Sequence, residues 1–245
     1  MVINCAAYTN VDNSENDKNV CFDVNAKSLE FISEISKNLN IFLVHFSTDY
    51  IFSGDNKIPY TEHDAPSPLN YYGESKLAGE SFIRKSGCNY MILRISSVYS
   101  EFGKNFFKTI VHKLKNNENL SIVSNQYMSP TYAPDIAVCV KEILNKINFR
   151  KEFKKTFNFC GDDVLSWYEF AIKIKDQFSS TFHHVKSDIK MIDDKTLKLM
   201  ATRPKYSALN PSKIFEEFKI RPSSIDLGIS SSLRGLTFKN KNEKS

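Results

Sequence analysis

The stretch IFLVHFSTDYIFSG, residues 41–54, begins as an apolar run and turns polar at its end. The apolar part, residues 41–46, predicts a strand buried on both faces, as strands of parallel sheets are. In open α/β sheets, ligands bind beyond the carboxyl ends of the strands. The side chains that follow the strand, Thr48, Asp49 and Tyr50, are therefore expected at a ligand site.

Strand and helix patterns alternate on either side of this stretch. Strands are predicted at residues 2–6, 41–46, 90–95, 120–123 and 157–160. Helices are predicted at 20–39, 70–85, 106–114, 134–147 and 166–178. Ser166 and Glu169 form a capping box at the start of the last helix. The alternation predicts an α/β fold with right-handed crossovers and a parallel sheet covered by helices on both faces.

Composition excludes several other classes of protein. The 245 residues are 41% hydrophobic, which is enough for a globular core, and we see neither a long membrane-spanning run nor a signal sequence. We therefore expect a cytoplasmic protein without a membrane partner. The net charge of +5 comes mainly from scattered lysines, so nucleic-acid binding is not expected. The five cysteines are widely spaced and predict neither disulfides nor a metal site.

A second polar stretch, YYGESK at residues 71–76, opens the predicted helix 70–85. Tyr72 and Lys76 are four residues apart, which places them on one helix face. When hydride reaches a carbonyl carbon, the oxygen needs a proton donor. A neighbouring ammonium lowers the pKa of a phenol, so Lys76 could activate Tyr72 as that donor. The Thr48 hydroxyl could bind the same oxygen.

The alternative is that Tyr72 and Lys76 are ordinary surface neighbours on an amphipathic helix. This spacing is common by chance. Its position one step after a strand that ends in Ser-Thr-Asp-Tyr favours the catalytic interpretation.

The segments containing these motifs resemble those of the dTDP-4-dehydrorhamnose reductases. This family belongs to the extended short-chain dehydrogenase/reductases. The segments are STDYIFSGDNKIPYTEHDAPSPLNYYGESKLAGE (47–80), VINCAAYTNVD (2–12), LRISSVYSEFGKNF (93–106), NQYMSPTYAPDIA (125–137) and RPKYSALNPSKI (203–214). They occur in the family's order and extend over nearly the whole chain.

The resemblance implies an NAD(P)H-dependent oxidoreductase. Its reaction would be reduction of the 4-keto group of dTDP-4-dehydro-L-rhamnose by NADPH or NADH, in dTDP-L-rhamnose biosynthesis for carbohydrates such as the lipopolysaccharide O-antigen. It implies Thr48, Tyr72 and Lys76 as catalytic residues, with Lys76 also holding the nicotinamide ribose. Mg²⁺ accompanies some members of the family, but the sequence suggests no ligands for it.

The resemblance also implies the binding residues. The cofactor would be lined by Ala6, Ala7, Tyr8, Thr9, Tyr72 and Lys76, although the alanine pair is also explained by close packing. The substrate would contact Thr48, Asp49, Tyr50 and Arg203. A salt-bridged arginine where the two parts of the fold meet is an equally good interpretation of Arg203.

By the same resemblance, we divide the chain into three parts. Residues 1–120 form a partial, Rossmann-type dinucleotide-binding domain, to which a strand near 156–160 contributes. Residues 121–238 form mainly a smaller sugar-nucleotide lobe, and residues 239–245 are a disordered tail.

The first glycine of the chain is Gly54, whereas the family begins with a strand and a glycine-rich turn that contacts the cofactor pyrophosphate. We therefore expect a doubly wound sheet without its first strands, which amounts to roughly 50 residues because one βαβ unit takes about 30. Dinucleotide binding should then be very weak, and the apolar strand at residues 2–6 should have a bare, aggregation-prone edge. A separately encoded amino-terminal fragment or a homodimer could complete the protein.

Three further positions depart from the family pattern: Ser97 replaces a tryptophan, Asn125 an aspartate and Met128 a glycine. Relaxed selection on a remnant of the enzyme would produce such changes. A different alternative is a non-catalytic binding or regulatory protein, because related folds serve in regulatory subunits. Intact Thr48, Tyr72 and Lys76 favour the enzyme.

Overall fold

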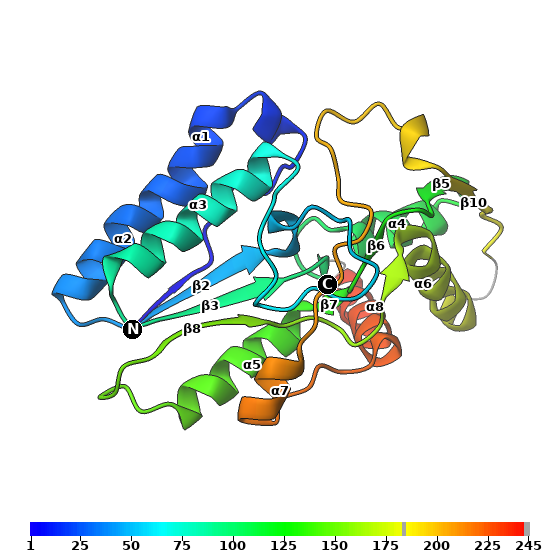
Figure 1. Cartoon of the computed structure of the whole chain (residues 1–245). Helices are drawn as coiled ribbons and strands as arrows, with labels where there is room; N and C mark the ends of the chain where they lie inside the picture. Colours follow the sequence, from blue (N-terminus) through cyan, green and yellow to red (C-terminus); the bar gives the residue numbers. More distant parts are fainter. Residues whose placement is uncertain (183–184, 243–245) are drawn as a thin grey trace.

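The computed structural model, which describes residues 1–182 and 185–242, has a four-stranded parallel sheet at its centre (Figure 1). The strands lie in the order β1 (Val2–Asn4), β2 (Leu43–Thr48), β3 (Tyr90–Ile95) and β8 (Lys154–Asn158). Every neighbouring pair is parallel. The predicted α/β fold with a parallel sheet is confirmed.

Helices cover both faces of this sheet (Figure 1). On one face lie α1 (Lys18–Phe22), α2 (Ser28–Asn38) and α3 (Tyr71–Ser86), and on the other α5 (Ala133–Lys146) and α7 (Ser212–Phe218). Side chains alternate along β2, so that Leu43 packs with Leu29 and Ile83, whereas Val44 packs with Ile143 and Phe157. Burial on both faces explains the continuous apolar run of β2.

The helix predicted at residues 20–39 is not continuous. A π-helical turn, Asp23–Lys27, separates α1 from α2 and buries Asn25. The turn lies against α3, where a Cβ added to Gly79 would stand 2.3 Å from the Asn25 carbonyl oxygen. Apolar periodicity cannot show such an insertion, because the residues on both sides of it keep their helical spacing.

A second group of helices lies beyond the carboxyl ends of the strands (Figure 1). It contains α4 (Phe106–Lys115), α6 (Trp167–Phe182) and α8 (Ile225–Asn242), with the parallel pair β5 (Leu120–Val123) and β10 (Ile189–Ile192). Its core includes Tyr99, Phe107, Phe170 and Ile229. Two further pairs of short strands lie between the sheet and this second group of helices. They are β4 (Val98–Tyr99) with β7 (Thr131–Tyr132), and β6 (Tyr127–Met128) with β9 (Leu165–Ser166).

The predicted capping box is confirmed, because the Ser166 hydroxyl accepts from Glu169 N and the Glu169 carboxylate accepts from Ser166 N. Helix α8 runs to Asn242 and so includes the first four residues of the expected tail. Residues 243–245 lie outside the described residues. Within the described ranges, no helix is long and apolar enough to cross a membrane.

Candidate active site

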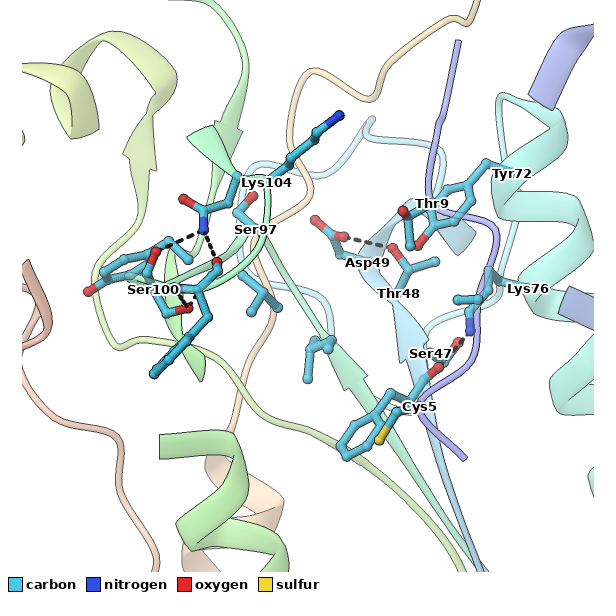
Figure 2. Close-up of a pocket in the computed structure, with 17 residues that line it drawn as sticks. Cys5, Thr9, Ser47, Thr48, Asp49, Tyr72, Lys76, Ser97, Ser100 and Lys104 are labelled. Atoms are coloured by element: carbon cyan, nitrogen blue, oxygen red, sulfur yellow. Dashed lines mark hydrogen bonds between the residues drawn. The ribbon is translucent and has the colours of Figure 1, made fainter. Parts of the chain in front are cut away.

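A cavity of about 500 Å³ opens at the carboxyl ends of β2 and β3 (Figure 2). Its walls come from the turn after β1, the end of β2, helix α3, and the segment from β3 to α4. Of the predicted site residues it brings together Ala7, Thr9, Thr48, Asp49, Tyr72 and Lys76. The others, Ala6, Tyr8, Tyr50 and Arg203, lie outside its lining.

Helix α3 begins where the Asn70 side chain caps it, accepting from Gly73 N at 2.9 Å. Tyr72 and Lys76 then lie on the face that lines the cavity. One turn further along, Glu80 accepts two hydrogen bonds from Arg94 of β3, at 3.0 and 2.9 Å. This buried ion pair fixes the helix to the sheet.

Lys76 is buried, with 3% of its surface exposed. Its Nζ donates to the Phe46 carbonyl oxygen at 2.6 Å and lies 3.3 Å from His45 Nε2. Burial lowers the pKa of Lys76 to about 8. Burial, together with the charge of Lys76, holds the pKa of His45 well below its usual value, so His45 is neutral.

Tyr72 points toward Thr48 across the cavity wall (Figure 2), and the two hydroxyls are within hydrogen-bonding reach. Burial raises the pKa of Tyr72 to about 12, while the hydrogen bond with Thr48 acts to lower it. The net shift of the Tyr72 pKa in this structure is therefore upward, opposite to the lowering that Lys76 alone would produce. The Lys76 ammonium is directed at the Phe46 carbonyl, and burial outweighs it at the phenol.

The Asp49 carboxylate is engaged on both oxygens. Thr48 Oγ1 donates to Oδ1 at 3.1 Å and Ser96 Oγ donates to Oδ2 at 2.8 Å, while Ser207 forms a further hydrogen bond. Only 3% of Asp49 is exposed. Burial raises the pKa of Asp49, and these hydrogen bonds oppose the shift.

Asn25 holds the turn after β1 in place, a role that the sequence analysis missed. Its side chain accepts from Tyr8 N at 2.8 Å and donates to Tyr8 O at 3.0 Å. It also lies 3.0 Å from Ser75 Oγ on α3. The available signal was an asparagine four residues from both Cys21 and Leu29, on the buried face of the predicted helix.

Arg203 forms a two-pronged ion pair with Asp12, at 3.0 and 2.7 Å. Of the two interpretations of Arg203, the structure shows the salt bridge. The guanidinium also lies within hydrogen-bonding reach of the Tyr50 phenol. Tyr50 in turn packs edge-on against Tyr72, with ring centroids 6.0 Å apart. Arg203 therefore contacts the cavity indirectly, through Tyr50.

The structure shows where the three residues that depart from the family pattern lie and what they contact. Asn125 donates to Asp193 and Asp194 at 3.0 and 2.9 Å, and a carboxylate there would have no N–H to donate. Met128 is buried in the core of the second helical group. Ser97 lines the cavity with a left-handed backbone, at φ 44°.

The donors in the cavity fit a nicotinamide nucleoside. Lys76 keeps N–H groups beyond the one used by Phe46, and the Tyr72 hydroxyl stands one helical turn away. Such donors suit ribose hydroxyls and a carbonyl oxygen.

The resemblance suggested Mg²⁺, but residues 1–182 and 185–242 contain no group of three or more His, Cys, Asp or Glu residues that could hold a metal ion. The described residues therefore offer no site for Mg²⁺.

Comparison with known proteins decides the family. Residues 1–237 match the family described as RmlD substrate binding domain. The chain belongs to this family. It is 35% identical to the dTDP-4-dehydrorhamnose reductase of Aggregatibacter actinomycetemcomitans over 227 residues, covering 91% of this chain and 76% of the relative. The reductase of Salmonella typhimurium is 30% identical over 230 residues, covering 94% and 77%.

Solved structures of the reductases agree with this assignment. A dTDP-4-dehydrorhamnose reductase from Bacillus anthracis in complex with NADP has a TM-score of 0.85 at 30% identity, covering 95% of this chain and 79% of that one. The Clostridium acetobutylicum reductase has a TM-score of 0.87 at 28% identity, covering 96% and 80%. The resemblance found in the sequence is confirmed: the chain is a member of an NADPH-dependent oxidoreductase family.

Proposed function

We propose that this chain reduces the 4-keto group of dTDP-4-dehydro-L-rhamnose with NADPH or NADH. The observation that carries the proposal is the meeting of Thr48, Tyr72 and Lys76 in one cavity at the carboxyl ends of the strands. The reductase names of the relatives and the NADP complex of the Bacillus anthracis protein support the substrate and the cofactor.

Bound nicotinamide would supply the hydride to the carbonyl carbon. Tyr72 holds the proton that the carbonyl oxygen receives, and with a pKa raised to about 12 it stays protonated at neutral pH. Transfer of that proton leaves a phenolate at Tyr72 and an alcohol on the sugar. The Lys76 ammonium, one helical turn away, favours the phenolate over the phenol.

The remaining roles concern binding. Lys76 and Tyr72 would hold the ribose beside the nicotinamide, and the turn Ala6, Ala7, Tyr8 and Thr9 would line it, with Asn25 fixing the turn. On the substrate side we place Tyr50, oriented by Arg203.

The test is NADPH oxidation, followed by absorbance, with dTDP-4-dehydro-L-rhamnose as substrate. Tyr72→Phe should lower the rate by about 100-fold or more, because it removes the proton donor. The matched control is Tyr71→Phe, which removes the hydroxyl of the adjacent tyrosine, outside the cavity lining. Equal rates for wild type and Tyr72→Phe would favour the non-catalytic alternative, and calorimetry with the dTDP-sugar would then show whether binding alone remains.

A further inference from the structure

A buried chain of hydroxyls ends on Asp49, in the wall of the cavity. The Asp49 carboxylate accepts from Thr48 on one oxygen and from Ser96 on the other, and Ser207 forms a third bond. These partners come from the end of β2, the residue after β3, and the segment that follows β10. Asp49 thus joins three separate parts of the chain immediately next to Thr48.

The direction of each hydrogen bond around Thr48 follows from the groups involved. The Tyr50 backbone N–H can only donate, so Thr48 Oγ1 accepts it at 3.2 Å. An ionised carboxylate can only accept, so the single hydroxyl proton of Thr48 goes to Asp49 at 3.1 Å. The Tyr72 phenol, within reach of the same oxygen, must then be the donor to Thr48.

We propose that Asp49 is a positioning residue: by holding the Thr48 proton, it makes Thr48 Oγ1 the acceptor of the Tyr72 hydroxyl in the protein without substrate. This inference rests on the proposed function and deepens it. Thr48 then orients the proton donor, and Tyr72 alone supplies the proton. When Tyr72 has given its proton to the substrate, the Thr48 hydroxyl can rotate toward the phenolate, exchanging its hydrogen bond to Asp49 for one to Tyr72 with no covalent bond made or broken.

Other ionisable groups face this chain of hydroxyls from the neighbouring elements. Lys76 on α3 contacts His45 on β2 at 3.3 Å, and Cys21 on α1 is near enough to Tyr72 for a charge on it to raise the pKa of the phenol. Arg203 interacts with the Tyr50 phenol. Substitutions that leave these four residues in place keep their charges constant, so the test can isolate Asp49.

The test follows the ionisation of residue 72 in this 245-residue chain, without cofactor or substrate. Tyr72→3,5-difluorotyrosine gives a fluorine NMR signal and a phenol that titrates nearer neutral pH. Asp49→Asn, which retains the shape of the side chain but can donate to Thr48, should lower the pKa at position 72. The same substitution beside Thr48→Val should lower it by less than half as much, because the effect is transmitted through the Thr48 hydroxyl. Equal falls in both backgrounds would mean that Asp49 acts by charge alone and would overturn the proposal.

Ser96→Ala tests the proposal without altering the charge of Asp49. Loss of the Ser96 donor makes the carboxylate hold the Thr48 proton more strongly, so the pKa at position 72 should rise. The control is Ser100→Ala, in the same cavity wall, whose hydroxyl bonds to Phe102 N and not to Asp49. An unchanged or lower pKa with Ser96→Ala would contradict the proposal. Both titrations are independent of reductase activity, so their failure is distinct from failure of the proposed function.

Discussion

At the scale of the residue, the charge of Lys76 should set the upper pH limit of the reaction. Its pKa of about 8 means that the ammonium is present below pH 8 and is lost as pH rises through that value. The ammonium favours the phenolate that forms at Tyr72. We therefore expect the maximal rate of NADPH oxidation to fall by about tenfold per pH unit above pH 8.

Lys104→Met is the control for this prediction, because Lys104 lines the same cavity from the segment before α4. That variant should retain the decline above pH 8. A profile of the wild type that stays flat from pH 7 to 10 would show that the charge of Lys76 does not limit the rate.

The residues that could be predicted are those whose chemistry is local in sequence. Thr48 ends a buried strand, and Tyr72 and Lys76 share a helix face, so strand ends and helical spacing were enough to place them in one cavity. Asn25 and Asp12 were missed because each acts on a partner distant in the chain: Asn25 on the turn at Tyr8, and Asp12 on a residue 191 positions away. Helical spacing could show that Asn25 is buried, but the partner of each residue depends on the fold and has no local pattern.

At the scale of the element, strand predictions were best where apolar runs are bounded by polar residues. β3 and β5 have the predicted ends, since their runs stop at turn residues on both sides. β8 begins three residues before its prediction because its first residues, Lys154 and Lys155, are polar although they pair with β3. Backbone hydrogen bonds to β3 determine where β8 begins, and the pattern of apolar residues does not show these hydrogen bonds.

The contact between the π-helical turn and α3 gives a prediction at this scale. Gly79→Ala would bring its Cβ to 2.3 Å from Asn25 O and 2.6 Å from Leu29 Cδ1, so the two helices must move apart. Overpacking of this kind costs about 1–3 kcal/mol of unfolding free energy, and the shift would loosen the hold of Asn25 on the Tyr8 turn. Urea denaturation measures the loss.

Ser81→Ala, two residues further along α3, is the control for Gly79→Ala and should change the unfolding free energy by less than about 0.5 kcal/mol. If Gly79→Ala were as stable as the control, the close approach of the two helices would not be needed for packing.

At the scale of the whole molecule, the segment after β10 contacts the turn after β1, the start of α3 and the segment after β2. Arg203 pairs with Asp12 beyond β1, and the Asn70 side chain at the start of α3 donates to Thr202 O at 2.8 Å. Further along, Leu209 forms a parallel bridge with Tyr60. This one segment therefore crosses the end of the sheet near the cavity, and it carries both Arg203 and Ser207 to the residues that surround Thr48 and Tyr72.

The edge of the sheet gives the prediction for the molecule as a whole. Within residues 1–182 and 185–242, only β2 pairs with β1, and Val2 and Ile3 are 38% and 43% exposed. Phe31 and Ile35, one turn apart on α2, are also more than half exposed. An apolar strand edge with free backbone groups promotes pairing between chains.

We expect the purified chain to self-associate with rising concentration in sedimentation velocity. The double variant Ile3→Lys, Phe31→Lys should shift the chain toward monomer. Val138→Lys, at an equally exposed apolar position on α5, should leave association unchanged. A wild-type chain that stays monomeric at all concentrations would show that this edge is protected in solution.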